Sequence, residues 1–245
     1  MLKAVLFDLD NTLILFHEEE FFKTYSQKLY LSFTDILTPQ DFFTKLMYST
    51  QKMIENNGDL SNADRFIEHF AEGMNTPSKK LWERFEKFYH TEFEEFQYLM
   101  QPIDKTRDVI LNIKKKGLKT VIATNPMFPT HVQHIRLGWA GLKNISFDLI
   151  TSAENFNYCK PNLDYYLEIC SQINEKPEDC LMVGNDPYND IIASKTGMKT
   201  YLTTDAEHLS FELSRKLAMK MNQQTPESNF EGKLSGIIEV IEQLV

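Results

Sequence analysis

The sequence has few cysteines and lacks any long apolar run. Its three cysteines are odd in number and do not have the paired spacing of metal ligands, so we expect neither a disulfide framework nor a cysteine-based zinc site. Buried thiols are typical of a reducing compartment, and we expect a cytoplasmic protein. No apolar run approaches the roughly 20 residues of a membrane span. The strand-like run starts directly after Lys3, the one charged residue before it, and leaves no room for the apolar segment of a signal peptide. We therefore expect no cleaved signal peptide and no membrane partner.

The chain also lacks an excess of lysine and arginine. Its net charge of −9 argues against a nucleic-acid polymer as partner, because such binding depends on clustered basic residues. The acidic balance does not exclude a small phosphate ester, since a metal ion and one lysine can reverse the local field. A length of 245 residues suffices for one large domain, or for a core with an insertion.

The chain begins with an apolar run that is followed by two aspartates. Val5, Leu6 and Phe7 are typical of a central parallel strand that is buried on both faces. Asp8 and Asp10 follow at once, and ligands of open α/β sheets bind beyond the carboxyl ends of the strands. Two carboxylates at such a place suit Mg²⁺, which takes oxygen ligands. Alone, such a pair more often only caps a turn.

The composition changes from about Phe16 to Pro102, where 12 of the 18 phenylalanines lie. Large apolar residues at helical spacing predict an all-helical insertion over residues 16–102. We expect helices at 18–33, 40–56 and 61–74, and a fourth that has Thr76 as N-cap and Pro77 as its first residue. That fourth helix is expected to carry one continuous aromatic stripe into a helix-on-helix core: Trp82, Phe85, Tyr89, Phe93 and Phe96.

After Ile103, predicted strands and helices alternate, which is typical of a parallel, doubly wound sheet. The expected strands cover 119–123, 147–151, 180–183 and 199–203. The expected helices cover 106–116, 129–137 and 162–173, and a further helix starts at Ile191. The stretch 222–232 reads as a loop and 234–244 as a closing helix. We therefore predict an α/β core formed by residues 1–15 and 103–245, a Rossmann-like fold that carries the helical insertion.

Three later segments place polar residues at the ends of these strands or beside them. Thr124 and Asn125 follow the strand at 119–123, and Lys160 precedes a proline ahead of a helix. The segment after 180–183 reads Gly-Asn-Asp-Pro-Tyr-Asn-Asp and ends at Asp190. Taken alone, each of these is an ordinary turn or loop residue, and only their order along the chain gives them weight.

Together with Phe7-Asp8-Leu9-Asp10-Asn11-Thr12-Leu13, these segments resemble, in order, the four signatures of the haloacid dehalogenase-like hydrolase superfamily. The resemblance implies that Asp8 is a nucleophile that becomes an aspartyl-phosphate and that Asp10 is the general acid and base. It also implies that Thr124 holds a phosphate oxygen, with the Asn125 amide beside it. Lys160 would offset charge on the nucleophile and the phosphoryl group. The helical insertion would be a mobile cap of the C1 type.

The fourth signature departs from the family pattern, which has an acid where this chain has Asn185. The spacing to Asp190 favours Asn185 as a metal ligand, whereas the preference of Mg²⁺ for carboxylates favours Asp186. On chemistry we expect Asp186, and Asp8 and Asp10 would complete the set of metal ligands. Asp190 is then expected to hold water or Lys160 in place.

The resemblance implies a Mg²⁺-dependent phosphatase that acts on a small-molecule phosphate monoester. We expect a monomer or homodimer. Asp10 favours this over a dehalogenase, since carbon–halogen cleavage needs no protonated leaving group. As an acid Asp10 needs a raised pKa, which like-charged neighbours would supply. Other readings are a phosphomutase of the same family, a phospho-accepting signalling module, and a binding protein that lost catalysis through Asn185.

Overall fold

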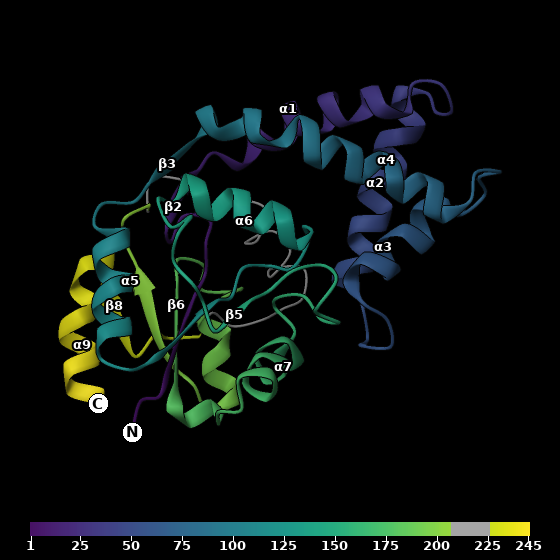
Figure 1. Ribbon diagram of the computed structural model, residues 1–245. Coiled ribbons are helices and arrows are strands. Elements are labelled where there is room, and N and C mark those ends of the chain that lie inside the picture. The colour runs from purple at the N-terminus through teal and green to yellow at the C-terminus, as the bar shows by residue number, and fades with distance from the viewer. Residues whose placement is uncertain (207–225) are drawn as a thin grey trace.

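The strand that begins the chain, β1 (Ala4–Phe7), lies in the middle of a six-stranded parallel sheet. The computed structural model describes residues 1–206 and 226–245. The sheet has the order β5-β4-β1-β6-β7-β8, and Figure 1 shows it with helices packed around it. The other strands are β4 (Lys119–Ile122), β5 (Leu149–Ile150), β6 (Cys180–Gly184), β7 (Lys199–Thr203) and β8 (Phe230–Gly232). The predicted α/β class with a parallel sheet is confirmed.

Helices cover both faces of the sheet because the side chains of β1 alternate between two cores. Val5 and Phe7 join a core to which α5, α6 and α9 contribute, whereas Ala4 and Leu6 join a second core with α7 and η4. All four β1 side chains are fully buried. The helix bounds are α5 (Thr106–Lys115), α6 (Thr130–Trp139), α7 (Leu163–Ile173), the 3-10 helix η4 (Ile191–Thr196) and α9 (Ile237–Leu244). Among the described residues, no helix is both long and apolar enough to cross a membrane.

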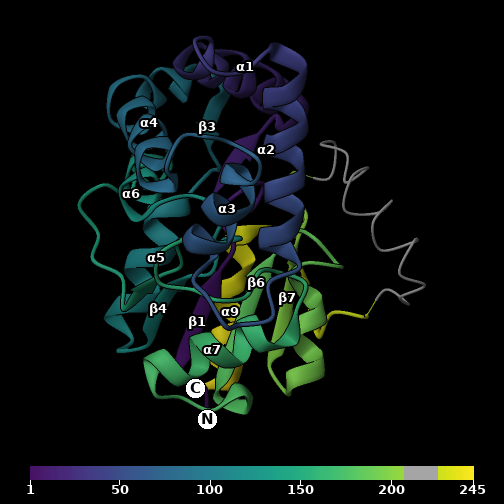
Figure 2. The ribbon, with the colours of Figure 1, turned by 90° about the vertical axis from the view of Figure 1, so that its right-hand side faces the viewer.

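The segment between β1 and the rest of the sheet is helical, and its aromatic core is continuous with the core on one face of the sheet. Its helices are α1 (Glu18–Tyr30), α2 (Pro39–Ile54), α3 (Asn62–Ala71) and α4 (Ser78–Thr91), with the 3-10 helices η1 (Leu31–Phe33) and η2 (Phe93–Leu99). Phe33, Phe70 and Phe85 are fully buried and lie 4.9–5.4 Å apart between ring centroids. Each such pair contributes about 0.5–1.5 kcal/mol beyond the area it buries. In Figures 1 and 2 this segment lies at the top of the molecule, above one end of the sheet.

A short two-stranded sheet stands where the chain leaves the α/β core and returns to it. β2 (Ile14–Phe16) pairs antiparallel with β3 (Met100–Pro102). The Thr106 hydroxyl donates to the Leu13 carbonyl at 3.1 Å and fixes the start of α5 against this pair. The sequence does not predict either strand, because three residues are too few to show a period-two pattern.

Four sequence predictions are wrong in detail. Pro77 is the N-cap of α4 rather than its first residue, no described side chain caps that helix, and α4 ends at Thr91. The aromatic stripe is therefore shared between α4 and η2: the backbone leaves helical geometry at Glu92 (φ −122°), and the Phe93 ring stacks on Trp139.

The other two corrections concern the end of the chain. The stretch 222–232, predicted as a loop, contains β8, which pairs with β7; residues 222–225 of that stretch lie outside the described residues. The Asn229 side chain accepts a hydrogen bond from the Thr200 amide at 2.9 Å and sets the register of this pair. The helix predicted from Ile191 is the 3-10 helix η4, which ends at Gly197 with φ +100°.

Candidate active site

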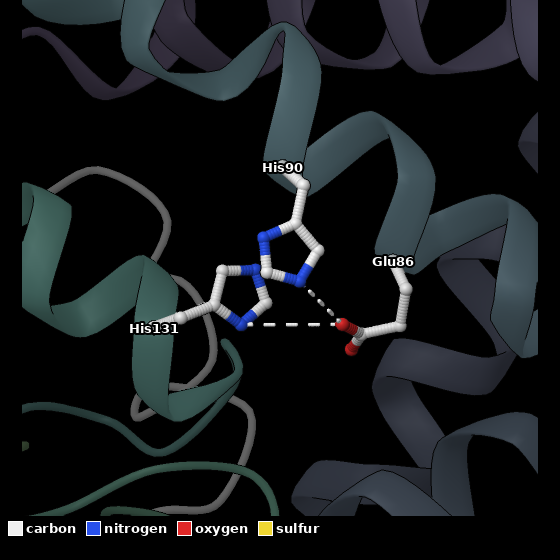
Figure 3. A group of neighbouring side chains, drawn as sticks. All are labelled: Glu86, His90 and His131. Carbon is white, nitrogen blue, oxygen red and sulfur yellow. Dashed lines mark ion pairs between the residues drawn. The ribbon is translucent and has the colours of Figure 1, made fainter.

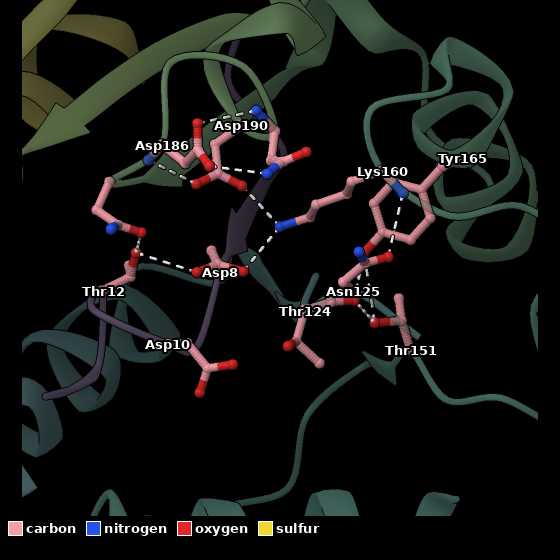
Figure 4. Close-up of polar contacts among 12 residues, drawn as sticks. Asp8, Asp10, Thr12, Thr124, Asn125, Thr151, Lys160, Tyr165, Asp186 and Asp190 are labelled. Carbon is pink, nitrogen blue, oxygen red and sulfur yellow. Dashed lines mark hydrogen bonds and ion pairs between the residues drawn. The ribbon is translucent and has the colours of Figure 1, made fainter. Parts of the chain in front are cut away.

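The predicted site residues gather at the carboxyl ends of three adjacent strands (Figure 4). Phe7 pairs with Ile122 of β4 and Val183 of β6, so these strands end level with one another. Asp8 follows β1, and its amide still donates to the Val183 carbonyl at 2.9 Å. The chain segments after β4 and β6 supply Thr124 and the acidic loop, and the loop before α7 supplies Lys160. Parallel register thus brings together residues that are far apart in the sequence.

Lys160 lies between two carboxylates. Its Nζ donates to Asp8 Oδ1 at 2.7 Å and to Asp190 Oδ1 at 2.6 Å, and its side chain is 2% exposed. Burial alone would lower the pKa of Lys160, but the adjacent carboxylates of Asp190 and Asp8 outweigh it and raise that pKa well above its usual value. Lys160 is therefore a fixed positive charge beside Asp8.

Asp190 is held tightly against the backbone at the end of β6. Its Oδ2 accepts a hydrogen bond from the Asp186 amide at 3.0 Å, while its Oδ1 binds Lys160. A Cβ at Gly184 would overlap the Asp190 side chain, so only glycine permits this close approach. Asp190 thus positions Lys160, which is one of the two roles that the sequence predicted.

Asn185 and Asp186 face different partners. The Thr12 hydroxyl lies 3.2 Å from Asn185 Oδ1 and 3.3 Å from Asp8 Oδ2, which places the Asn185 amide oxygen beside the Asp8 carboxylate. Asp186 directs both of its carboxylate oxygens into its own loop. Oδ1 accepts from the Tyr188 amide at 2.8 Å and Oδ2 accepts from the Asn189 side chain at 2.7 Å.

Asp10 has a partner that the sequence did not reveal. Both of its carboxylate oxygens accept hydrogen bonds from Nη2 of Arg136, a buried residue of α6, whose Nη1 donates to Gln133 at 2.7 Å. Burial raises the pKa of the Asp10 carboxyl, Arg136 opposes this, and Asp8 adds to it. The predicted rise is therefore present, but burial rather than like charge is its main cause.

Thr124 and Asn125 fix the backbone on the other side of Asp8. The Thr124 carbonyl accepts hydrogen bonds from the Thr151 hydroxyl at 2.6 Å and from the Tyr165 hydroxyl at 2.8 Å. The Asn125 side chain accepts from the Lys160 amide at 3.2 Å, and so ties the two loops together. The structure thus gives Asn125 a contact to Lys160 through its side chain, in addition to its predicted backbone amide.

The donor set around Asp8 fits a hard divalent cation. The described side chains that converge there offer carboxylate and amide oxygens, the ligands that Mg²⁺ prefers. Asp8 and Asp190 pair with Lys160, and Asp10 pairs with Arg136, so the site combines several carboxylates with two cationic side chains. Asp8 and Asn185 each have one side-chain oxygen within hydrogen-bond distance of the Thr12 hydroxyl. The other two predicted ligands have other partners. The carboxylate oxygens of Asp10 bind Arg136, and those of Asp186 accept hydrogen bonds within its own loop.

The helical segment contacts the core close to this site. The amides of Asn62 and Ala63, at the start of α3, donate to the carbonyls of Phe156 and Ala153 at 2.9 and 2.8 Å. At the start of α1, the pKa of Glu18 is raised by burial and by the charges of Asp10 and Asp186. The negative charges of the carboxylates after β1 and β6 therefore act on an ionisable side chain in the first turn of the helical segment.

Comparison with known proteins agrees with this geometry. The family model of haloacid dehalogenase-like hydrolases matches residues 2–196. A glyceraldehyde 3-phosphate phosphatase of Methanothermobacter thermautotrophicus is 28% identical over 84% of this chain and 89% of its own. A Caldanaerobacter subterraneus protein is 26% identical over 87% of this chain and 86% of its own. It carries the provisional name pyrophosphatase PpaX. A phosphatase structure from Thermococcus onnurineus shares the fold, with a TM-score of 0.55 and 18% identity over 98% of both chains.

Proposed function

Because this chain belongs to the haloacid dehalogenase-like hydrolases, we propose that it is a Mg²⁺-dependent phosphatase that forms an aspartyl-phosphate on Asp8. One observation carries the proposal: Asp8 lies between Lys160 and the Thr12–Asn185 pair, with Asp10 two residues away. This arrangement offers a nucleophile, a fixed positive charge and a second acid at one strand end. One relative is named for glyceraldehyde 3-phosphate, a small phosphate monoester, and another for pyrophosphate, a small phosphoanhydride. We propose a small phosphate monoester as the substrate class.

In the first step, a carboxylate oxygen of Asp8 attacks phosphorus as the bond to the leaving oxygen breaks. Lys160 offsets negative charge on the transferring group. Asp10 gives its proton to the leaving oxygen, and its raised pKa favours the protonated form that this requires. In the second step, Asp10 as a base takes a proton from water, which attacks the phosphorus of the aspartyl-phosphate and releases Asp8.

Asp8 and Asn185 would hold the Mg²⁺ ion, because one side-chain oxygen of each lies within hydrogen-bond distance of the same Thr12 hydroxyl. When bound, the ion would supply positive charge to the phosphate oxygens. Asp186 would then act in the loop rather than as a ligand. The contacts therefore support Asn185 over Asp186, the residue that we expected from chemistry alone.

We propose residues 16–102 as a cap that closes over the site. The Asn62 and Ala63 hydrogen bonds to the core support a closed arrangement, which would exclude water other than the attacking molecule. A covered site favours an enzyme over a signalling module that must expose its phosphoryl group to partners. A cytoplasmic location, and assembly as a monomer or homodimer, stay predictions from the sequence.

The test is turnover of 4-nitrophenyl phosphate with and without Mg²⁺. We expect chelation to abolish phosphate release, Mg²⁺ to restore it, and Ca²⁺ to restore it poorly, because Ca²⁺ prefers more ligands and looser geometry. Full activity in excess chelator would contradict the metal requirement. Absence of turnover at any Mg²⁺ concentration, on this ester and on a panel of sugar, nucleotide and carboxylate phosphates, would favour a binding protein. Release of inorganic phosphate from that panel separates a hydrolase from a mutase.

A further inference from the structure

A second group of ionisable side chains lies outside this site, where the helical segment meets the core (Figure 3). Glu86 and His90 lie one turn apart on α4, and His131 lies in the first turn of α6. Each offers one ligand atom, and these atoms all lie within 4.8 Å of one another. The sequence gives no sign of the group, because His131 is distant from the other two along the chain.

The separations are close to those of a metal site. His90 Nε2 lies 3.3 Å from Glu86 Oε2, and His131 Nδ1 lies 4.0 Å from the same oxygen. Metal–ligand bonds of roughly 2.0 Å in a tetrahedral site place neighbouring ligand atoms about 3.3 Å apart. One of the three pairs already has this spacing. The Glu86–His131 pair lies 4.0 Å apart and the two imidazole nitrogens lie within 4.8 Å of each other, so ion binding would draw the side chains together and tilt the imidazole rings.

The two imidazole rings contact each other, and one of them contacts Tyr89. The His90 and His131 rings stack with centroids 4.0 Å apart and 10° between their planes, and Tyr89 packs edge-on against His131. Nε2 of His131 is buried, so Nδ1 is the nitrogen that it can offer to an ion. The side chain of His90 is 61% exposed and that of Glu86 is 28% exposed, so an ion can enter from solvent and keep a water as its fourth ligand.

We propose that Glu86, His90 and His131 form a binding site for a zinc-class divalent ion. Two imidazoles and one carboxylate suit Zn²⁺ and Co²⁺, whereas Mg²⁺ prefers oxygen ligands. The site is therefore chemically distinct from the oxygen-lined site at Asp8. Because its ligands come from α4 and α6, a bound ion joins the helical segment to the core. The proposal does not depend on the proposed phosphatase activity.

The experiment titrates Zn²⁺, and separately Co²⁺, into the full chain in excess Mg²⁺. We expect one equivalent to bind, a visible Co²⁺ absorption band typical of tetrahedral nitrogen and oxygen ligands, and an upward shift of the melting temperature. His90→Ala and His131→Ala should each weaken binding at least about tenfold, since loss of even an outer partner of a metal site costs that much. Both variants should abolish the melting shift.

The matched control is His134→Ala, an exposed histidine on the same helix α6. It should bind Zn²⁺ as the parent chain does. If His131→Ala does not fold, His90→Ala at its exposed position carries the test, and circular dichroism without metal checks its fold. Zn²⁺ affinity unchanged in His90→Ala, or lowered equally in His134→Ala, would overturn the site and leave an ordinary surface ion pair.

Discussion

Arg136 donates hydrogen bonds to both carboxylate oxygens of Asp10, across 126 residues of sequence. Arg136 is buried, and its guanidinium also lies 5.3 Å from the Phe128 ring centroid. The planar guanidinium of an arginine on a packed helix fixes the position of the carboxylate, whereas a flexible lysine side chain cannot. We therefore interpret Arg136 as the residue that positions the proposed general acid.

Arg136→Lys should lower kcat by about 10²-fold, because misplacing a reacting group by about 1 Å has that effect. The loss should be larger for an alkyl phosphate than for 4-nitrophenyl phosphate, whose good leaving group needs less help from an acid. Steady-state kinetics on both esters measures this, with the surface variant Arg107→Lys as control. Equal losses on the two esters would indicate a structural role alone.

Removing the charge of Lys160 should destabilise the protein as well as inactivate it. Lys160→Met leaves Asp8 and Asp190 buried without a counter-ion, and breaking such a pair costs about 3 kcal/mol or more. Adding Asp190→Asn should restore part of the unfolding free energy, because one uncompensated charge is removed. Urea denaturation of the parent, the two single variants and the double variant measures the coupling. Additive losses would show that the two residues do not interact.

Gly184→Ala should disturb the site although it adds only one methyl group. The new Cβ overlaps the Asp190 side chain, and such overpacking costs about 1–3 kcal/mol. Turnover should fall with stability, since Asp190 holds Lys160. Gly138→Ala in α6 meets no atom within 4 Å and should be neutral or slightly stabilising. Melting temperatures of the two variants compare them directly, and a neutral Gly184→Ala would contradict the close approach.

Asn185→Asp should lower the Mg²⁺ concentration that half-maximal turnover needs by roughly tenfold, a change of about 1.4 kcal/mol. A carboxylate there replaces a neutral amide oxygen beside Asp8 at nearly equal volume. Asp186→Asn should leave Mg²⁺ dependence near that of the parent but lower stability, because Asp186 holds its loop through three hydrogen bonds. Mg²⁺ titrations of both variants decide between the two residues. The reverse pattern would make Asp186 the ligand, and equal dependence would mean that neither is.

The sequence predicted the residues at strand ends and missed those that depend on tertiary packing. Asp8 and Thr124 could be expected at one edge because parallel strands end together, and Lys160 and Asp190 were added by the resemblance to the family signatures. Arg136 could not be expected there, since only the docking of α6 brings it to Asp10 in the loop after β1. In the sequence, the only indication of its role is that a charged residue lies on the buried face of helix α6.

The choice at Asn185 shows a second limit of the sequence. Spacing and ligand chemistry pointed to different residues, and the hydrogen bonds of the two side chains, which the sequence does not reveal, favour Asn185 in our proposal. The short strands β2, β3 and β8 were missed for a simpler reason: three residues carry too little pattern.

The most direct test of Asp8 as the nucleophile is acid quenching during turnover, followed by mass spectrometry of the peptide that contains Asp8. We predict a peptide with the added mass of one phosphoryl group on Asp8. In Asp8→Asn, both this adduct and turnover should fall to background while circular dichroism shows an intact fold. Retained turnover in Asp8→Asn, or a phosphoryl group on another residue, would contradict the proposed mechanism.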